Sequence, residues 1–217
     1  MTGKPILLAD DHPLFRAALR QAVQGAAPER EVIETSSLGE ARAAIKARGP
    51  GLLCLDLHMS DSDGFAGLIA LRQEWPALPV AIVSGSEEPS VARRAISFGA
   101  SAFVPKSLDV EDIRVAIAAV LDGETWTPAN FGATEDPAEA ALADRLASLT
   151  PAQLKVLLHV RAGLLNKQIA YEMSISEATV KAHMTAILRK LEVQTRTQAV
   201  LAAGALIAEP DAPKDDA

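Results

Sequence analysis

Five short apolar runs alternate with longer segments of helical spacing over the first 122 residues, and this alternation restricts the fold more than any other feature of the chain. The apolar runs are predicted to be strands at residues 6–10, 31–35, 52–56, 79–84 and 102–104. The other segments are predicted to be helices at residues 14–24, 38–48, 64–74, 89–98 and 109–122. Parallel strands need crossover connections, which such helices supply. The sequence therefore predicts an α/β fold with a five-stranded, doubly wound parallel sheet.

Polar side chains close three of these apolar runs. Asp10 and Asp11 follow the first run, Asp56 ends the third, and Ser84 ends the fourth. Parallel sheets place ligand sites beyond the carboxyl ends of their strands, so we expect the three carboxylates to meet in one crevice. Carboxylates brought so close repel one another unless a cation neutralises them, and oxygen ligands suit Mg2+. The pattern indicates a magnesium site at which chemistry on phosphate takes place.

Charge is distributed unevenly along the chain. Residues 1–130 carry 12 basic and 17 acidic side chains, a net of −5, and residues 131–149 add −3. Residues 150–208 carry 7 basic and 3 acidic side chains, a net of +4, before residues 209–217 return −3. The overall charge of −7 therefore conceals a basic module, which favours two domains over one.

Cysteine content and hydropathy indicate the compartment. The single cysteine, Cys54, lies inside an apolar run and has no partner for an intramolecular disulfide, which is compatible with a reducing environment. The chain has no apolar stretch of 18 or more residues and no apolar signal core at its N-terminus. We therefore expect a soluble, cytoplasmic protein that does not bind membranes.

The alternating pattern ends after Gly123. Turn-forming residues and an Ala-rich stretch follow, which predicts a partly helical connector. Four short helices are then expected at residues 151–161, at 167–173, from 177 onward, and at 197–207. The predicted organisation is a first domain at residues 1–123, a connector at 124–148, a smaller all-α domain at 149–208 and a disordered acidic tail at 209–217.

The polar residues of the first domain, taken in order and spacing, resemble the receiver domain of two-component response regulators. The resemblance covers residues 5–122 and is carried by Asp10, Asp11, the segment Asp56–Gly64, Ser84 with Gly85, and Pro105 with Lys106. It implies a flavodoxin-like receiver fold in which Asp56 is the phosphoacceptor and takes a phosphoryl group from a sensor histidine kinase.

The resemblance also implies a metal site. Mg2+ would be held by Asp11, Asp56 and the backbone carbonyl of His58, and by Asp10 through a water. The imidazoles of His12 and His58 are not expected to bind Mg2+, because this ion prefers oxygen ligands.

Three further positions follow from the same resemblance. The Lys106 ammonium would pair with the new phosphoryl group, and the Ser84 hydroxyl would donate a hydrogen bond to it. Phe103 matches the family's aromatic switch position and would turn inward when the loop moves, although core packing explains this residue equally well. The chain departs from the family at Ser60, where proline is usual, and a more flexible loop there would alter the lifetime of the phosphate.

The basic module resembles the LuxR-type helix-turn-helix over residues 150–207. The matching segments are Leu149–Leu157, Gly163–Ala170, Ile175–Met184 and Leu188–Leu191. A receiver followed by this module is similar to the NarL/FixJ family of transcription factors. The first helix departs from that family, since the acidic residues usual there are replaced by Ala152, Gln153 and Leu154.

The third helix of the module is expected to read DNA. Ser176 is predicted to cap it, with a buried stripe formed by Val180, Met184, Ile187, Leu188 and Leu191. Lys181 suits contacts with phosphate or guanine, and the methyl groups of Thr179 and Val180 suit thymine. His183 would make either a base contact or a structural hydrogen bond. The candidate DNA-binding residues are Asn166, Lys167, Thr179, Val180, Lys181, His183 and Arg189.

The fourth helix of the module carries a stripe of small apolar residues. Its members are Ala199, Val200, Ala203 and Leu206. Packing within its own domain explains part of the stripe, and a two-fold dimer contact would explain the rest. Such a dimer would read half-sites about one turn of DNA apart.

These features predict a response regulator transcription factor. Phosphorylation of Asp56 would control dimerisation and sequence-specific binding to double-stranded DNA, and the active form would be a homodimer. We expect no enzymatic activity beyond self-phosphorylation and self-dephosphorylation at Asp56. Two alternatives remain: a DNA-binding regulator that does not depend on phosphorylation, and an aspartate-nucleophile phosphatase of the haloacid dehalogenase type. The second needs an aspartate two residues after the nucleophile, where this chain has His58.

Overall fold

The chain divides into two compact units, each of which is described by itself. The structure, a computed structural model, describes residues 3–61, 64–131 and 137–207. The described part of the first unit is residues 3–61 and 64–131, and that of the second is residues 137–207.

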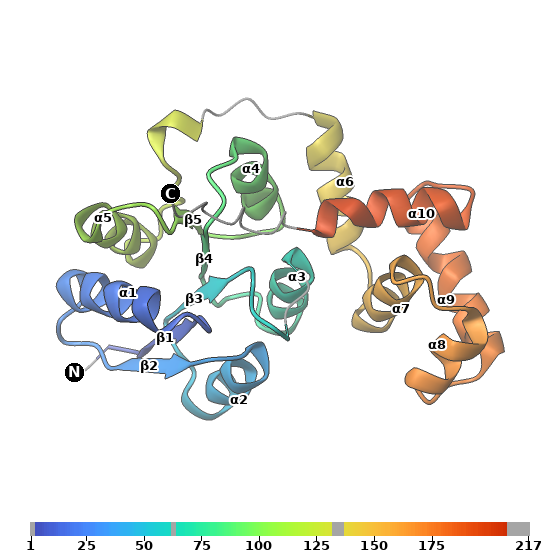
Figure 1. Ribbon diagram of the computed structural model, residues 1–217, viewed down its shortest axis with the longest axis horizontal. Coiled ribbons are helices and arrows are strands. Elements are labelled where there is room, and N and C mark those ends of the chain that lie inside the picture. The colour runs from blue at the N-terminus through green and yellow to red at the C-terminus, as the bar shows by residue number, and fades with distance from the viewer. Residues whose placement is uncertain (1–2, 62–63, 132–136, 208–217) are drawn as a thin grey trace, which may run out of the picture. The chain divides into compact units, whose positions relative to one another are not determined.

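Strands and helices alternate strictly in the first unit (Figure 1). The elements described there are β1 (Ile6–Ala9), α1 (Pro13–Ala26), β2 (Val32–Thr35), α2 (Leu38–Arg48), β3 (Leu52–Asp56), α3 (Phe65–Glu74), β4 (Val80–Ser84), α4 (Pro89–Ser97), β5 (Ala102–Pro105) and α5 (Val110–Leu121). Every strand and helix predicted for this region is confirmed, with ends that differ by at most two residues.

The strands form one parallel sheet in the order β2-β1-β3-β4-β5. Strand β1 therefore lies between β2 and β3. The chain passes from β1 to β2 on one side of β1, and then crosses to β3, β4 and β5 on the other side. A crevice opens beyond the carboxyl ends of β1 and β3 at such a point, and ligands of doubly wound sheets bind there. The predicted fold class is confirmed.

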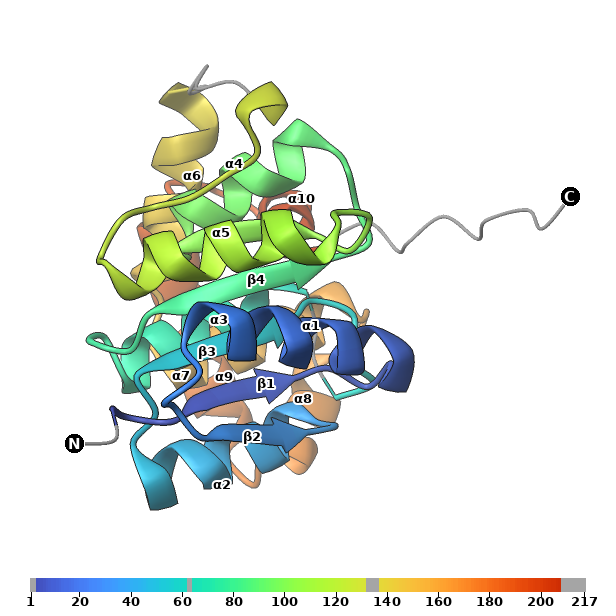
Figure 2. The same cartoon turned by 90° about the vertical axis from the view of Figure 1, so that its left-hand side faces the viewer.

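Helices cover both faces of this sheet. Helices α1 and α5 pack together on one face, in front of the strands in Figure 2, while α2, α3 and α4 lie on the other face (Figure 1). On the α1 and α5 side, apolar residues of the helices pack against alternate residues of the strands, among them Leu8 and Cys54. All four residues of β1 and all five of β3 are buried, which explains why these runs are continuously apolar rather than alternating.

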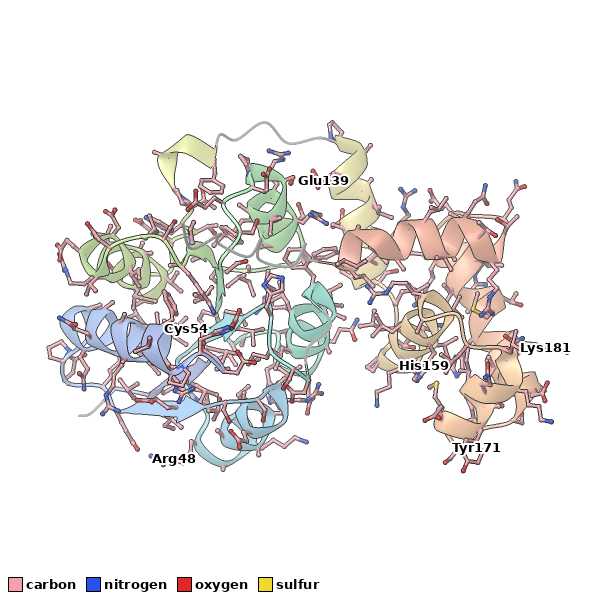
Figure 3. The ribbon with its side chains drawn as sticks, in the orientation of Figure 1. Arg48, Cys54, Glu139, His159, Tyr171 and Lys181 are labelled. Atoms are coloured by element: carbon pink, nitrogen blue, oxygen red, sulfur yellow. The ribbon has the colours of Figure 1, made fainter. Side chains whose placement is uncertain are left out.

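Cys54 lies at the centre of this core (Figure 3). Burial raises the pKa of its thiol to about 12. Because the thiolate is the reactive species, we expect the folded protein not to react with iodoacetamide at neutral pH and to react fully in denaturant. Intact-mass spectrometry after timed labelling measures this difference, and rapid labelling of the folded protein would contradict the buried position.

The segment after α5 packs against the edge of the sheet. Trp126 donates its backbone N–H to the carbonyl of Ser101 at 3.0 Å, and its carbonyl accepts from the N–H of Phe103 at 3.1 Å. A short 3-10 turn, η1 (Ala129–Phe131), then brings the ring of Phe131 to 5.9 Å from that of Phe103. The first residues of the predicted connector are thus held on β5, and residues 132–136 lie outside the described residues.

The second unit is helical. Its elements are α6 (Pro137–Ala147), α7 (Pro151–Arg161), α8 (Asn166–Glu172), α9 (Glu177–Lys190), α10 (Arg196–Ala203) and the 3-10 turn η2 (Gly204–Leu206). Helix α6 lies in the stretch predicted as a partly helical connector, and it buries Ala143 and Leu146. The predicted tail at residues 209–217 lies outside the described residues. No helix in the described ranges has the length and apolar character needed to cross a membrane.

Side-chain caps set the starts of two helices of the second unit. The Ser176 hydroxyl accepts the N–H of Thr179 at 3.0 Å, so the predicted cap of α9 is confirmed. Gln153 and Thr150 form a reciprocal capping box at the start of α7. The replacement of an acidic residue by Gln153 therefore retains a functioning cap. The predicted stripe of α9 is buried except for Leu188, which is half-buried.

Candidate functional site

The predicted acidic crevice is present at the switch point of the sheet. Ala9 of β1 pairs with Leu55 of β3, so the residues that follow them, Asp10 and Asp56, lie side by side. Both side chains are fully buried, and that of Asp11 is 29% exposed. The structure therefore brings together the three carboxylates that the strand ends predicted.

Backbone groups orient the two buried carboxylates. The N–H of His12 donates to Asp10 Oδ1 at 2.7 Å, and the N–H of His58 donates to Asp56 Oδ1 at 3.0 Å. Each bond closes a turn two residues long, a conformation that aspartate favours. The Oδ2 atoms of both residues remain directed at the same cation.

That cation is Lys106, which follows β5. Its Nζ lies 2.7 Å from Asp56 Oδ2 and 3.0 Å from Asp10 Oδ2. Burial alone would lower the pKa of Lys106, but the hydrogen bond and charge of Asp56, with those of Asp10, outweigh it and raise the pKa above its ordinary value of 10.5. The side chain is therefore a permanent ammonium ion at neutral pH.

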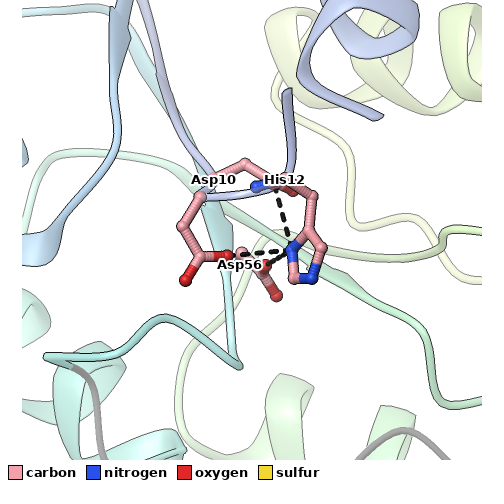
Figure 4. A group of neighbouring side chains, drawn as sticks. Asp10, His12 and Asp56 are labelled. Carbon is pink, nitrogen blue, oxygen red and sulfur yellow. Dashed lines mark hydrogen bonds and ion pairs between the residues drawn. The ribbon is translucent and has the colours of Figure 1, made fainter. Parts of the chain in front are cut away.

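His12, which follows Asp11 in the sequence and was not expected to bind Mg2+, contributes a ring nitrogen to the crevice. Its Nδ1 lies 2.8 Å from Asp11 Oδ1. The same nitrogen lies 3.5 Å from one oxygen of each of Asp10 and Asp56, the two carboxylates drawn with it in Figure 4. The same atom is 3.3 Å from Lys106 Nζ. The imidazole itself is 58% exposed to solvent.

The donor set fits a hard divalent cation. The three carboxylates carry a formal charge of −3 and the Lys106 ammonium ion carries +1, so the formal negative charge of the cluster exceeds the positive by two. Oxygen-rich sites with excess negative charge bind Mg2+ well. The residues at hand are therefore suited to the ion that the sequence predicted.

Ser84 and Phe103 occupy the places expected from their strands. Ser84 is fully buried at the end of β4, where its hydroxyl oxygen accepts the N–H of Ser86 at 3.2 Å. Its carbonyl accepts the N–H of Lys106 at 2.7 Å, which joins the ends of β4 and β5. Phe103 is already fully buried in this structure, so an inward turn is not needed to bury it. Its role as a switch remains a prediction.

The candidate DNA-binding residues of the second unit differ in exposure. Lys167, Thr179, Lys181 and Arg189 are exposed, while Asn166 and His183 are half-buried. Figure 3 shows Lys181 pointing away from the body of the helical unit. Val180 is fully buried in the apolar stripe of α9, so the predicted methyl contact between this residue and thymine is wrong. A position in the stripe faces the helices of its own domain and is closed to DNA.

One basic residue that the sequence did not single out holds the start of α8. Arg196 donates from Nη1 to Asn166 Oδ1 at 3.1 Å and from Nη2 to the carbonyl of Leu164 at 2.5 Å. The partners are 30 and 32 residues away in sequence, and no local pattern marks them.

Two families of known proteins match the two units. Residues 6–118 match the response regulator receiver domain, and residues 147–203 match the bacterial regulatory proteins of the luxR family. The chain is 41% identical over 208 residues to the glycerol metabolism activator of Pseudomonas putida, with 92% of this chain and 94% of that protein covered. It is 32% identical over 207 residues to the nitrate/nitrite response regulator protein NarP of Escherichia coli (strain K12), with 90% and 92% covered.

Solved structures agree on the fold. The RcsB response regulator of Salmonella typhimurium is 19% identical, with a TM-score of 0.55 over 94% of this chain and 99% of that one. A complex of the response regulator RcsB with DNA gives a TM-score of 0.56 at the same identity and coverage. With the receiver match over the acidic crevice and the LuxR-type match over the basic helices, this chain belongs to the NarL/FixJ family of two-component response regulators.

Proposed function

We propose that Asp56 accepts a phosphoryl group from a sensor histidine kinase and that its phosphorylation controls dimerisation and DNA binding. The observation that supports this most strongly is the pairing of a fully buried Asp56 with Lys106 at 2.7 Å, beside two further carboxylates. A nucleophilic carboxylate, a cation for the incoming phosphoryl oxygens and ligands for a divalent metal are thereby held within one crevice.

In this mechanism, a carboxylate oxygen of Asp56 attacks phosphorus, and the bond between phosphorus and the kinase histidine breaks. Asp10, Asp11, Asp56 and the His58 carbonyl would hold Mg2+, which offsets the repulsion between the carboxylate and the phosphoryl group when bound. The bond from the His58 N–H to Oδ1 fixes the rotation of the nucleophile. Lys106 then transfers its pairing from the carboxylate to a phosphoryl oxygen.

The conformational change that follows phosphorylation would begin at the ends of β4 and β5. Ser84 would turn its hydroxyl from the Ser86 N–H toward the phosphoryl group, and Lys106 is tied to the Ser84 carbonyl. A shift of these two loops would change the packing around Phe103 and favour a second arrangement of the receiver. In this account residues 1–123 act as the receiver, 124–148 as the connector and 149–208 as the DNA-binding domain.

DNA would be read by α9, and its phosphates would be bound at the start of α8. The exposed side chains of Thr179, Lys181 and Arg189 on α9, with Lys167 on α8, supply a basic polar surface. RcsB, which shares the fold, has been solved in complex with DNA and as dimers on DNA. We assign this chain the same class of partner, a homodimer as its active form, and a cytoplasmic location.

Lys181→Ala is expected to weaken binding to target DNA about tenfold, since one base or phosphate contact is lost. Fluorescence anisotropy at fixed salt concentration measures the dissociation constant. Lys155→Ala on α7 is the matched control, because it removes the same charge from an exposed helical site outside α8 and α9. Equal losses in both variants would show a general charge effect and contradict the assignment of Lys181.

Sedimentation velocity with and without acetyl phosphate and Mg2+ tests the proposed control of dimerisation. Wild type is expected to shift from monomer to dimer on phosphorylation, and Asp56→Asn is expected to remain monomeric. A phosphorylated protein that sediments unchanged would contradict the proposal.

The family regulates transcription, and His58 stands where the phosphatase alternative needs an aspartate, so no turnover of small phosphate esters is expected.

A further inference from the structure

The start of α2 is bound by a carboxylate from another part of the chain. Asp61 Oδ1 accepts the N–H of Leu38 at 2.8 Å, and its Oδ2 accepts the N–H of Gly39 at 2.9 Å. The next N–H, that of Glu40, is accepted by the hydroxyl of Ser37 at 3.1 Å. The first three amide groups of this helix are thus all satisfied by side chains, two of them through bonds to an ionised group at the positive end of the helix dipole.

Asp61 also belongs to residues 57–61, the segment that directly follows the proposed phosphoacceptor Asp56. This segment is fixed at its beginning, where the His58 N–H donates to Asp56 Oδ1, and in its middle, where the Met59 side chain is 3% exposed. Ser60 is exposed. Leu57 is fully buried as well, and its N–H donates to the carbonyl of Val83 at 3.3 Å. The two bonds from Asp61 to α2 hold the far end of residues 57–61.

The position of this segment bears on the metal site. His58 carries the carbonyl proposed as a ligand, and it lies only three residues before Asp61. A backbone ligand keeps its place only when the chain on both sides of it is held. Asp56 holds the chain before His58, and the bonds of Asp61 hold it after.

We propose that Asp61 is a positioning residue for the metal site, acting by anchoring residues 57–61 to the first turn of α2. The proposal rests on the proposed function of Asp56 as a phosphoacceptor that uses Mg2+. Asp61 itself touches neither the metal nor the phosphoryl group. Its loss would release the loop and weaken binding of the ion in a protein whose three carboxylates are all intact.

Isothermal titration of the full-length protein with Mg2+ tests this directly. Asp61→Ala is expected to raise the dissociation constant about tenfold, as loss of supporting contacts does in other metal sites. The half-life of the acyl phosphate is expected to change in the same variant. Ser37→Ala is the matched control, because it removes one cap from the same helix without touching the loop. Both variants are expected to lower the thermal midpoint, and only Asp61→Ala is expected to alter Mg2+ binding.

A second substitution separates anchoring from simple loss of charge. Ser60→Pro stiffens the backbone of the loop, so the double variant with Asp61→Ala is expected to recover much of the Mg2+ affinity. Failure to recover it would assign the effect to charge and overturn the anchoring role. Equal Mg2+ affinity in wild type, Asp61→Ala and Ser37→Ala would overturn the inference while leaving the proposed function intact. Absence of Mg2+ binding in wild type would contradict the proposed function itself.

Discussion

Replacing Asp56 by asparagine is expected to abolish uptake of a phosphoryl group from acetyl phosphate in the presence of Mg2+. The amide has no nucleophilic oxygen comparable to a carboxylate, and loss of a nucleophile lowers turnover about a thousandfold or more. The fold should persist, because the amide oxygen can still accept the His58 N–H that Asp56 Oδ1 accepts. Intact-mass spectrometry of the protein after timed incubation measures the phosphorylated fraction.

Asp122→Asn provides the control for this substitution. Asp122 is exposed at the end of α5, so the same chemical change is made away from the crevice. This variant is expected to label like wild type. Undiminished labelling of Asp56→Asn would assign the phosphoacceptor to another residue and overturn the account of the crevice.

Lys106→Met is expected to destabilise the protein by about 3 kcal/mol in the absence of divalent metal, since removing one partner of a buried ion pair leaves uncompensated charge. Only 13% of the Lys106 side chain is exposed, and it is the single ammonium ion paired with Asp10 and Asp56 in the described residues. Urea unfolding in the presence of EDTA measures the loss. Added Mg2+ should restore part of it, because the metal supplies positive charge to the same carboxylates.

The pH dependence of this effect has a definite sign. Because the pKa of Lys106 is raised in the folded protein, its contribution to stability is fully present below pH 10.5 and is lost only as the pH rises through the folded-state value. The titration of Lys106 should therefore leave the difference in free energy of unfolding between wild type and Lys106→Met constant between pH 7 and pH 9. Lys4→Met, a control at an exposed lysine, should lower the free energy of unfolding only slightly. Equal stability of wild type and Lys106→Met would show that the ion pairs contribute nothing to the fold.

The strands and the meeting of Asp10, Asp11 and Asp56 could be predicted because both depend on short-range patterns. Continuous apolar runs mark strands buried on both faces, and parallel topology then places their last residues at one edge. Lys106 was identified through the resemblance to receiver domains, and its place after the last strand brings it to the same edge. These residues lie far apart in sequence, yet the order of strands brings them together without further information.

Contacts that depend on side-chain direction were not predictable in this way. The position of the His12 ring nitrogen among the carboxylates depends on the rotation of one exposed imidazole. The hydrogen bonds from α2 to Asp61 join residues that lie 22 and 23 positions apart. Val180 was given two roles, one in the stripe and one on the DNA surface, and its complete burial shows that only the stripe is correct. Helical spacing fixes which residues share a face, but tertiary packing fixes how wide the buried face is.

The central claim is that phosphorylation of Asp56 controls DNA binding, and the ratio of DNA affinities with and without acetyl phosphate and Mg2+ tests it most directly. The target should be a duplex selected from random sequences by the phosphorylated wild-type protein, measured at one salt concentration. Two linked DNA-binding domains bind paired half-sites more tightly than one, so phosphorylation is expected to raise wild-type affinity about tenfold or more and to leave Asp56→Asn unchanged. Equal affinity for fully phosphorylated and unphosphorylated wild type would contradict the account and identify a regulator that does not depend on phosphorylation.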